Sequence, residues 1–366
     1  MHLRRRRQVT TAGLAVCALA LAACSSSSSS STSSTSTSSS SASSSASSAP
    51  VSGTLNGSGS TFQLTFQQEA ISSFKSVQSG MTVNYSGVGS GTGRSDLAAG
   101  TVNFAGSDSP IPSAEASTFK GTVLYFPVVI GPITVSYNLS GLSKPLQLSA
   151  STIADIFEAK ITTWNNSAIA ADNPGVSLPS TTITICRRSD SSGTTQNFSE
   201  FLVKGAPSVW TLGSSSTIKW PADSRGGNGN GGVASCIKST SGAVGYVDYA
   251  DAKASSLTFA SVKNSAGNYV APSPTSATAA ADSVTAAANL TFSAIWASGA
   301  QAYPITYQSW VLAYETQPNA NDAAMLKAYI GYLLGAGQQL LPTLGYAPLP
   351  SGLDSMAKAQ LSMITS

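Results

Sequence analysis

A polar loop of small residues that leads into a helix is the feature that most constrains the fold of this chain. The clearest copy lies at 187–194 and reads Arg-Arg-Ser-Asp-Ser-Ser-Gly-Thr. It follows the apolar, β-branched run 181–185, and after it Phe198 and Phe201 take the i, i+3 spacing of an amphipathic helix. The pattern therefore predicts a strand, a tight turn and a helix in direct succession.

Two further joints of this kind occur earlier in the chain. Residues 56–62 and 85–94 are rich in Gly and Ser, and a helical pattern follows each of them. Amphipathic helices are also expected at 152–163 and 322–334. Strand-like runs alternate with the helical patterns, and they lie at 81–85, 102–106, 124–130, 134–137, 181–185 and 245–247. This alternation predicts an α/β fold with mainly parallel sheets.

The first turn of the helix that follows the clearest loop is a candidate anion site. Backbone N–H groups at a helix start lack intrahelical partners and carry partial positive charge. Arg188, Ser192 and Thr194 add donors, so the turn could surround a tetrahedral oxyanion. An ordinary helix cap beside surface arginines is the alternative. Asp108 is a carboxylate in a neutral, small-residue setting, and it serves either as a ligand or as the cap of a turn.

Five short segments, in chain order, resemble the phosphate-binding proteins of bacterial ABC importers (PstS type). The segments lie at 57–62, 83–91, 102–108, 188–194 and 242–249. Beyond residue 250 the resemblance is loose. It implies an α/β, two-lobed periplasmic-binding-protein fold (type II), with a hinge and a ligand cleft between the lobes.

The resemblance also implies which residues bind phosphate. They come from several loops, namely Thr61, Phe62, Ser90, Asp108, Arg188, Ser192, Gly193 and Thr194. Asp190 is expected to pair with Arg188 and hold the plane of its guanidinium group. The carboxylate of Asp108 would accept a hydrogen bond from protonated phosphate and disfavour sulfate. Two positions depart from the family pattern: Gly91 stands where many relatives have serine, and Ser191 stands where glycine is usual.

The folded part is long enough for two lobes, because about 315 residues follow position 50. One candidate crossing between the lobes is the apolar run 126–132, and the other is the small-residue run 242–246. The first lobe would then comprise 51–128 and 246–366, and the second lobe 129–245.

A glycine-rich stretch at 225–232 reads Arg-Gly-Gly-Asn-Gly-Asn-Gly-Gly. It matches a dinucleotide-binding pattern, but no strand is expected before it, so that interpretation fails its context test. We expect a flexible loop there, at the rim of the cleft. Residues 251–288 are rich in Ala, Ser and Thr, and they are expected to form loops and a weak helix without a site.

The first 50 residues carry targeting signals instead of fold. Residues 1–23 combine four arginines with a short apolar run and end in Leu-Ala-Ala before Cys24, which is typical of a lipoprotein signal peptide. A plain signal peptide is the alternative. Residues 24–50 would then consist of an acylated Cys24, carrying fatty acids such as palmitate, and a disordered Ser/Thr tether. Together they would anchor the chain to the extracytoplasmic face of the membrane.

The net charge argues against a nucleic-acid partner. The chain has 19 basic and 16 acidic residues, and four of the basic residues lie in the signal at 4–7. The mature chain therefore has 15 basic and 16 acidic residues, a net charge of −1. An anion site in such a chain has to rely on directed hydrogen bonds.

The residue types also argue against catalysis. His2 is the only histidine and lies in the signal, so the mature chain can run neither Ser-His-Asp nor Cys-His chemistry. We expect no enzyme activity, no metal and no cofactor. Cys186 and Cys236 are expected to form a disulfide, because two cysteines outside the membrane usually pair.

The leading hypothesis is a monomeric receptor that binds inorganic phosphate with high affinity and delivers it to the permease subunits of an ABC importer. A binding protein for another oxyanion, such as sulfate or molybdate, is one alternative. A secreted phosphatase that uses Asp108 or Ser192 is a second, and a surface adhesin or sensor is a third.

Overall fold

The computed structural model describes residues 51–366. The predicted signal peptide, the acylation site Cys24 and the Ser/Thr tether lie outside the described residues. Within 51–366, no helix combines the length and the apolar composition that crossing a bilayer requires.

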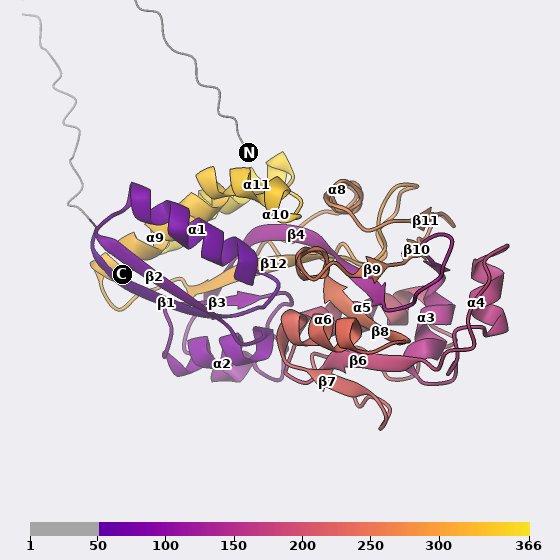
Figure 1. The fold of residues 1–366 in the computed structure, drawn as a ribbon. Coiled ribbons are helices and arrows are strands. Elements are labelled where there is room, and N and C mark those ends of the chain that lie inside the picture. The colour runs from indigo at the N-terminus through magenta and orange to yellow at the C-terminus, as the bar shows by residue number, and fades with distance from the viewer. Residues whose placement is uncertain (1–50) are drawn as a thin grey trace, which may run out of the picture. The chain divides into compact units, whose positions relative to one another are not determined.

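A nine-stranded mixed sheet organises this part of the chain (Figure 1). The strand order is β2-β1-β3-β12-β4-β8-β6-β7, and β9 pairs with β4 outside this path. The strands are β1 (Gly53–Gly59), β2 (Met81–Gly87), β3 (Phe104–Ser107), β4 (Val123–Tyr137), β6 (Thr184–Arg188), β7 (Arg225–Gly227), β8 (Ala243–Asp248), β9 (Thr258–Phe259) and β12 (Thr306–Tyr314). Parallel pairs lie at both ends of the order and antiparallel pairs in its middle, so the α/β fold is confirmed but the sheet is not mainly parallel.

Two long strands connect the ends of the sheet. The first part of β4 pairs with β12, and residues 133–137 of β4 pair with β8. The sequence predicted two strands here with a break at Gly131 and Pro132. Both residues are instead extended and lie opposite Tyr307 and Thr306 of β12, so the strand continues through them.

Helices cover both faces of the sheet at its β1–β3 end (Figure 1), and further helices follow the strands at the other end. In Figure 1, α1 (Leu64–Val77) and α2 (Ser90–Ala99) lie on either side of β1–β3. We call these five elements the β1–β3 group. At the other end, α5 (Gly193–Gly205) follows β6 and α6 (Gly229–Ser239) follows β7. We call β6, β7, β8, α5 and α6 the β6–β8 group.

The remaining elements surround these two groups. The helix expected at 152–163 is shorter, because α3 ends at Phe157 and Ala159 has a φ of 58°. The helix expected at 322–334 is present as α9. The segment 251–288 is more regular than expected, since it contains two strands of a small sheet and a helix. These elements are α3 (Ala150–Phe157), α4 (Ser167–Asp172), α7 (Tyr249–Ala254), α8 (Pro274–Ala281), α9 (Ala320–Leu334), α10 (Leu341–Leu344), α11 (Ser351–Gln360), β5 (Gln147–Leu148), β10 (Ser261–Lys263) and β11 (Tyr269–Val270).

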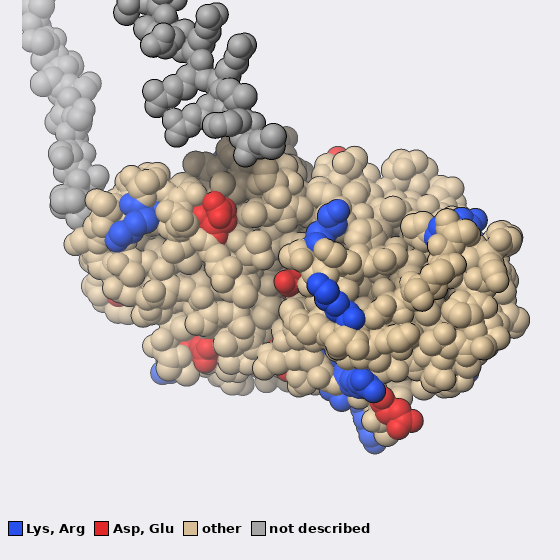
Figure 2. All heavy atoms as spheres, viewed as in Figure 1, with Lys and Arg blue, Asp and Glu red and all other residues tan. Residues whose placement is uncertain are grey.

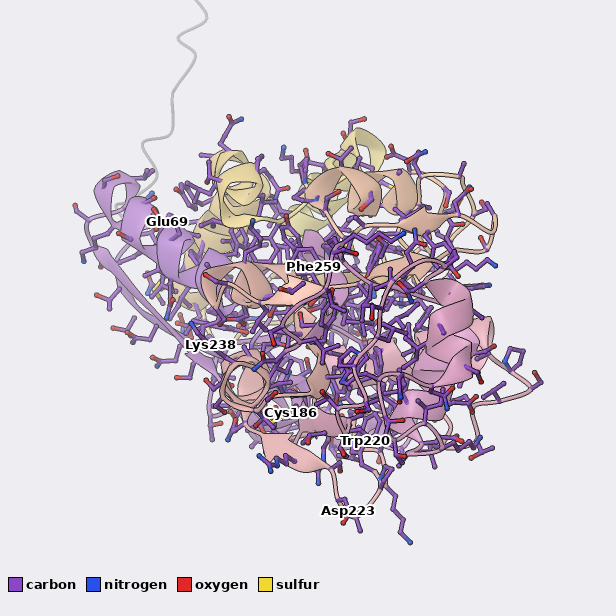
Figure 3. The ribbon with its side chains drawn as sticks, turned by 45° about the vertical axis from the view of Figure 1, so that its right-hand side comes forward. Glu69, Cys186, Trp220, Asp223, Lys238 and Phe259 are labelled. Carbon is purple, nitrogen blue, oxygen red and sulfur yellow. A yellow bond between two sulfur atoms is a disulfide. The ribbon has the colours of Figure 1, made fainter. Side chains whose placement is uncertain are left out.

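The structure contains the expected disulfide between Cys186 and Cys236. Their Cα atoms are 6.1 Å apart, and the bond joins β6 to α6. Cys186, which is labelled in Figure 3, is fully buried against Val233 and Ile237 of α6. The bond therefore fixes the strand that leads into the loop 189–192.

Candidate functional site

Four strand-to-helix joints carry the polar residues of the site. They are β1–α1, β2–α2, β6–α5 and β7–α6, and the sequence predicted the first three. The fourth corrects the flexible loop expected at 225–232, because Arg225–Gly227 is a strand and a helix begins at Gly229. This strand has no apolar or β-branched side chain, and its backbone pairing with β6 holds it in place.

Asp108 lies directly after β3 and is 1% exposed. Its Oδ1 accepts a hydrogen bond from the Ser309 hydroxyl, and its Oδ2 accepts one from Ser90 Oγ at 3.2 Å. Ser90 Oγ also accepts from the Asp108 N–H. The Asp108 carbonyl accepts from Asn197 Nδ2 of α5 at 2.7 Å. Asp108 thus contacts α2, β12 and α5 at once.

Burial and polar contacts act on the Asp108 carboxyl in opposite directions. Burial raises the pKa of the carboxyl above its usual value, because the charged form loses its hydration. The hydroxyl groups of Ser309 and Ser60 and the charge of Arg188 act in the opposite direction. Any further hydrogen bond that the carboxylate accepts therefore stabilises its charged form.

Arg188 ends β6 and is 3% exposed. Its Nε donates to Asp190 Oδ1 at 2.8 Å, its Nη2 pairs with Asp190 Oδ2, and its Nη1 donates to Thr194 Oγ1 at 3.3 Å. Asp190 Oδ1 also accepts from the N–H of Gly229 at the start of α6. The backbone N–H of Arg188 donates to the hydroxyl of Tyr246. The guanidinium plane is therefore held from several directions.

The ion pair keeps both partners charged. Burial by itself lowers the pKa of Arg188, but the contact with Asp190 outweighs it and the pKa is raised. Burial raises the pKa of Asp190, and the contact with Arg188 outweighs that in turn, so this pKa is lowered. The three bonds to side chains use three of the five guanidinium N–H groups, which leaves one on each terminal nitrogen for a further acceptor.

The start of α5 lies against Asp108 and Ser90. A Cβ added to Gly193 would lie 2.5 Å from Ser90 Oγ and 2.6 Å from Asp108 Cβ, so only glycine fits there. The N–H groups of Gly193 and Thr194 are the first two of the helix and have no intrahelical acceptor. The Ser192 hydroxyl accepts from the N–H of Thr195, which is a helix cap.

Asn230 of α6 is a site residue that the sequence did not single out. It is fully buried, and its Nδ2 donates to Thr61 Oγ1 at 3.1 Å and to Thr194 Oγ1 at 3.3 Å. Its backbone N–H also donates to Thr61 Oγ1. Asn230 therefore links the joint after β1 with the start of α5. Its only sequence signal was its place in the glycine-rich stretch.

Phe62 provides an apolar wall beside these polar groups. Its ring stacks on Tyr307 with 4.1 Å between ring centroids, and Tyr346 meets it edge-on at 5.2 Å. Its N–H donates to Ser60 Oγ at 3.0 Å, and the Tyr346 hydroxyl donates to its carbonyl. Phe62 is 1% exposed, so its ring is packed away from solvent beside the polar groups.

The two positions that depart from the family pattern face each other. The N–H of Gly91 donates to the Ser191 carbonyl at 3.1 Å. A Cβ added to Gly91 would lie 2.0 Å from Ser191 Oγ and 2.5 Å from Ser191 Cβ. The side chain of Ser191 thus occupies the space that a serine at position 91 would need.

We predict that serine is tolerated at position 91 only when position 191 is glycine. The substitution Gly91→Ser should weaken anion binding by about tenfold or more, because the loop that carries Asp190 has to move away from α2. Ser191→Gly should have little effect, and the double variant should recover most of the affinity. Titration calorimetry on the four proteins measures this coupling.

The matched control is Gly231→Ser, which adds the same side chain to the first turn of α6. An added Cβ there has no atom within 4 Å, so we expect no change in affinity. Unchanged binding in Gly91→Ser would show that the contact between Gly91 and Ser191 is unimportant.

The surface in Figure 2 carries few charged side chains, and positive and negative ones are interspersed. The charges that concern the site lie inside instead: Asp108 and Arg188 are buried, and Asp190 is half-buried. Short-range hydrogen bonds, and not a broad positive field, are therefore available to hold an anion.

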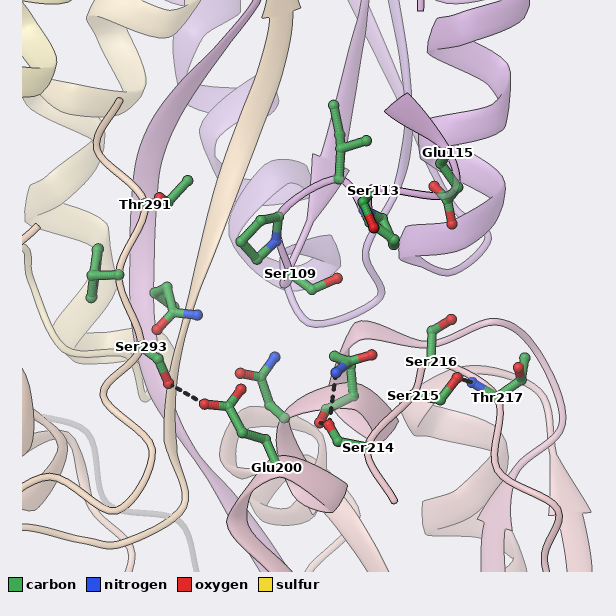
Figure 4. A pocket seen from close by; sticks show the side chains of 17 residues that line it. Ser109, Ser113, Glu115, Glu200, Ser214, Ser215, Ser216, Thr217, Thr291 and Ser293 are labelled. Carbon is green, nitrogen blue, oxygen red and sulfur yellow. Dashed lines mark hydrogen bonds between the residues drawn. The ribbon is translucent and has the colours of Figure 1, made fainter. Parts of the chain in front are cut away.

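A cavity of about 740 Å³ lies beside the site (Figure 4). Ser109 and Asn197 belong to its wall, and Asn197 binds the Asp108 carbonyl. Glu200, on the same wall, accepts a hydrogen bond from Ser293 at 2.8 Å. The cavity wall thus joins α5 to the segment after Asp108 and to the segment before β12.

We use the term cradle for the residues that lie together at the four joints and at the end of β3: Thr61, Ser90, Asp108, Arg188, Gly193, Thr194 and Asn230. The cradle contains many donors, one of them a guanidinium group, and one carboxyl group of raised pKa. Such a set suits a small oxyanion that carries one proton, because the carboxylate can accept that proton's hydrogen bond.

Comparison with known proteins identifies relatives of this chain. Residues 44–336 match the family model of the PBP superfamily domain. Phosphate-binding protein PstS of Xylella fastidiosa is 34% identical over 313 residues, which cover 83% of this chain and 84% of that protein. The protein of the same name from Haemophilus influenzae is 34% identical over 84% of this chain and 92% of its own length. Phosphate-binding protein PstS 3 of Mycobacterium tuberculosis is 32% identical over 85% of this chain and 86% of its own.

Solved structures share the fold. A high affinity periplasmic phosphate-binding protein, PfluDING, bound with phosphate, aligns with a TM-score of 0.70 at 21% identity, over 84% of this chain and 94% of that one. A phosphate-binding protein from Stenotrophomonas maltophilia aligns with a TM-score of 0.66 at 19% identity, over the same shares of the two chains. The fold predicted from the sequence is therefore confirmed.

Proposed function

The chain belongs to the PstS family of phosphate-binding proteins, and from this premise we infer that it binds inorganic phosphate and delivers it to the permease of an ABC importer. The observation that carries the proposal is the position of Asp108 among hydrogen-bond donors that include Arg188. It is a receptor and not an enzyme. The family relationship does not favour a secreted phosphatase or a receptor for sulfate or molybdate.

We assign the phosphate contacts to the residues that the resemblance named. Arg188 would bind phosphate oxygens with its two remaining N–H groups, and Gly193 and Thr194 with their backbone N–H groups. Asp108 would accept the phosphate proton's hydrogen bond. The other contacts come from Thr61, Phe62, Ser90 and Ser192. Asp190 would orient Arg188.

The roles of two residues differ in kind from the rest. The N–H of Phe62 and the hydroxyl of Ser192 already have partners in Ser60 and in the N–H of Thr195. Phe62 would therefore contribute mainly its ring. Ser192 only accepts in its bond with Thr195, so it would contribute its hydroxyl proton as well as the capped start of α5.

We also propose how the chain is placed in the cell. Cys24 would be acylated after removal of residues 1–23, and the tether would hold a monomeric receptor on the outer face of the membrane. The lobes would comprise 51–128 with 246–366, and 129–245. The pairing of β4 with β12 and then with β8 supports a first crossing within 126–132. The second crossing was placed at 242–246, within β8. There β8 pairs with both β4 and β6, and β12 is the strand that returns to β3.

Titration calorimetry of residues 48–366, stripped of bound anion, tests the proposed function. We expect phosphate to bind at neutral pH with micromolar or tighter affinity and sulfate to produce no heat of binding. A preference for sulfate or molybdate would show that the ligand is another oxyanion. No heat of binding with any anion would refute the receptor function.

A further inference from the structure

Tyr307 has the one buried hydroxyl among the tyrosines of residues 51–366 that lacks a hydrogen-bond partner. Its side chain is fully buried in β12. The other buried tyrosines each bond through their hydroxyl: Tyr125, Tyr137, Tyr246, Tyr303, Tyr329 and Tyr346. An unsatisfied buried hydroxyl costs free energy, so this exception calls for a function.

The strand direction turns this hydroxyl toward the cradle. Tyr307 and Ser309 are two residues apart on β12, so their side chains lie on the same face. Ser309 uses that face to donate to Asp108 Oδ1. The Tyr307 ring also stacks on Phe62, which follows the cradle residue Thr61. Tyr307 thus lies between Asp108 and the start of α1.

The electrostatic environment agrees with this position. Burial raises the pKa of Tyr307 well above its usual value, and the nearby carboxylates of Asp108 and Asp248 raise it further. The hydroxyl of Thr194, another cradle residue, acts in the opposite direction as a donor toward the phenol oxygen, and it leaves the phenol's own proton without an acceptor. The phenol therefore keeps its proton near neutral pH and can donate it.

We propose that the Tyr307 hydroxyl donates a hydrogen bond to an oxygen of the bound phosphate, as a further ligand of the cradle. The inference rests on the proposed function, because it names one more contact for the same anion. A neutral donor adds to the affinity without adding charge, which fits a site that has few positive groups.

The test is Tyr307→Phe, which removes the hydroxyl and keeps the ring that stacks on Phe62. We expect the dissociation constant for phosphate to rise by about tenfold or more. The melting temperature of the phosphate-free variant should be unchanged or higher, because the hydroxyl that is removed has no partner.

The matched control is Tyr303→Phe. Tyr303 is equally buried, but its hydroxyl donates to the carbonyl of Ile133 at 2.8 Å. This variant should melt at a lower temperature and bind phosphate as the wild type does. The opposite pattern in the two variants separates a ligand contact from a structural one.

The outcomes also separate this inference from the proposed function. If the wild type binds phosphate and Tyr307→Phe binds it equally well, Tyr307 is no ligand and the receptor function stands. If the wild type binds no phosphate, both fail. A lower melting temperature together with unchanged affinity in Tyr307→Phe would show a purely structural hydroxyl and overturn the inference.

Discussion

Replacing Arg188 with alanine is expected to weaken phosphate binding by about thirtyfold to several thousandfold, which corresponds to about 2–5 kcal/mol. The guanidinium group is buried, and two of its N–H groups remain for the anion after Asp190 and Thr194 have taken theirs. Charge-assisted bonds in a buried site are the strongest contacts that this cradle offers. Titration calorimetry measures the loss directly.

The neighbouring arginine provides the control. Arg187 is half-buried, and it bonds to Ser224 and to the Arg188 carbonyl instead of the cradle. Arg187→Ala should therefore keep the affinity within about twofold of the wild type. A loss below about tenfold in Arg188→Ala would place Arg188 outside the site.

Folding has to be followed in the same experiment, because Arg188→Ala leaves the carboxylate of Asp190 without its partner. The side chain of Asp190 is 12% exposed, so the unpaired charge lowers the free energy of unfolding as well. Arg188→Lys keeps a positive charge beside Asp190 but cannot bind two oxygens with one planar group. We expect it to fold like the wild type and to bind phosphate at an affinity between the two.

Replacing Asp108 with asparagine is expected to remove discrimination between phosphate and sulfate. Phosphate carries a proton near neutral pH, and the carboxylate can accept its hydrogen bond. Sulfate has no proton there, so it meets only the negative charge and the lone pairs of Asp108. Asparagine removes the charge and supplies a donor, so phosphate should lose affinity while sulfate gains it. Parallel titrations with both anions measure the change in the ratio.

The same variant should be at least as stable as the wild type when no anion is bound. The pKa of Asp108 is raised in the folded protein, so the folded state holds this proton more tightly than the unfolded chain. The wild type therefore loses stability as the pH rises from the usual carboxyl pKa through the raised one. Asp108→Asn should lack that pH dependence in thermal melts.

Ser309→Ala is a useful companion, because it removes a hydrogen bond to Asp108 but leaves the carboxylate in place. It should weaken phosphate binding modestly and preserve the preference over sulfate. Equal losses for both anions in Asp108→Asn would contradict the role of this carboxylate in reading the proton.

Local motifs predicted the part of the site that lies within single loops. The pair Arg188 and Asp190 is two residues apart, and Gly193 and Thr194 follow in the same joint. Such contacts depend on a strand, a turn and a helix start, which a short window of sequence encodes. The α/β alternation followed from the same kind of signal.

The contacts that were missed come from pairing between distant segments. Ser309 and Tyr307 belong to β12, and Ser309 meets Asp108 across 201 positions of sequence. Nothing in the sequence of β12 indicates a ligand, because a polar residue on a buried strand resembles any satisfied core hydroxyl. The antiparallel centre of the sheet was missed for a similar reason, since strand order depends on tertiary packing.

Several hydrogen bonds connect the β1–β3 group and the adjoining Asp108 to the β6–β8 group, and they bear on how long an anion stays bound. They run from Gly91 to Ser191, from Asn197 to the Asp108 carbonyl and from Asn230 to Thr61. Because the cradle atoms are buried, we expect these bonds to break before an anion leaves. The residence time of phosphate is then the lifetime of the closed cradle, and a permease that pulls the two groups apart controls when the cargo is released.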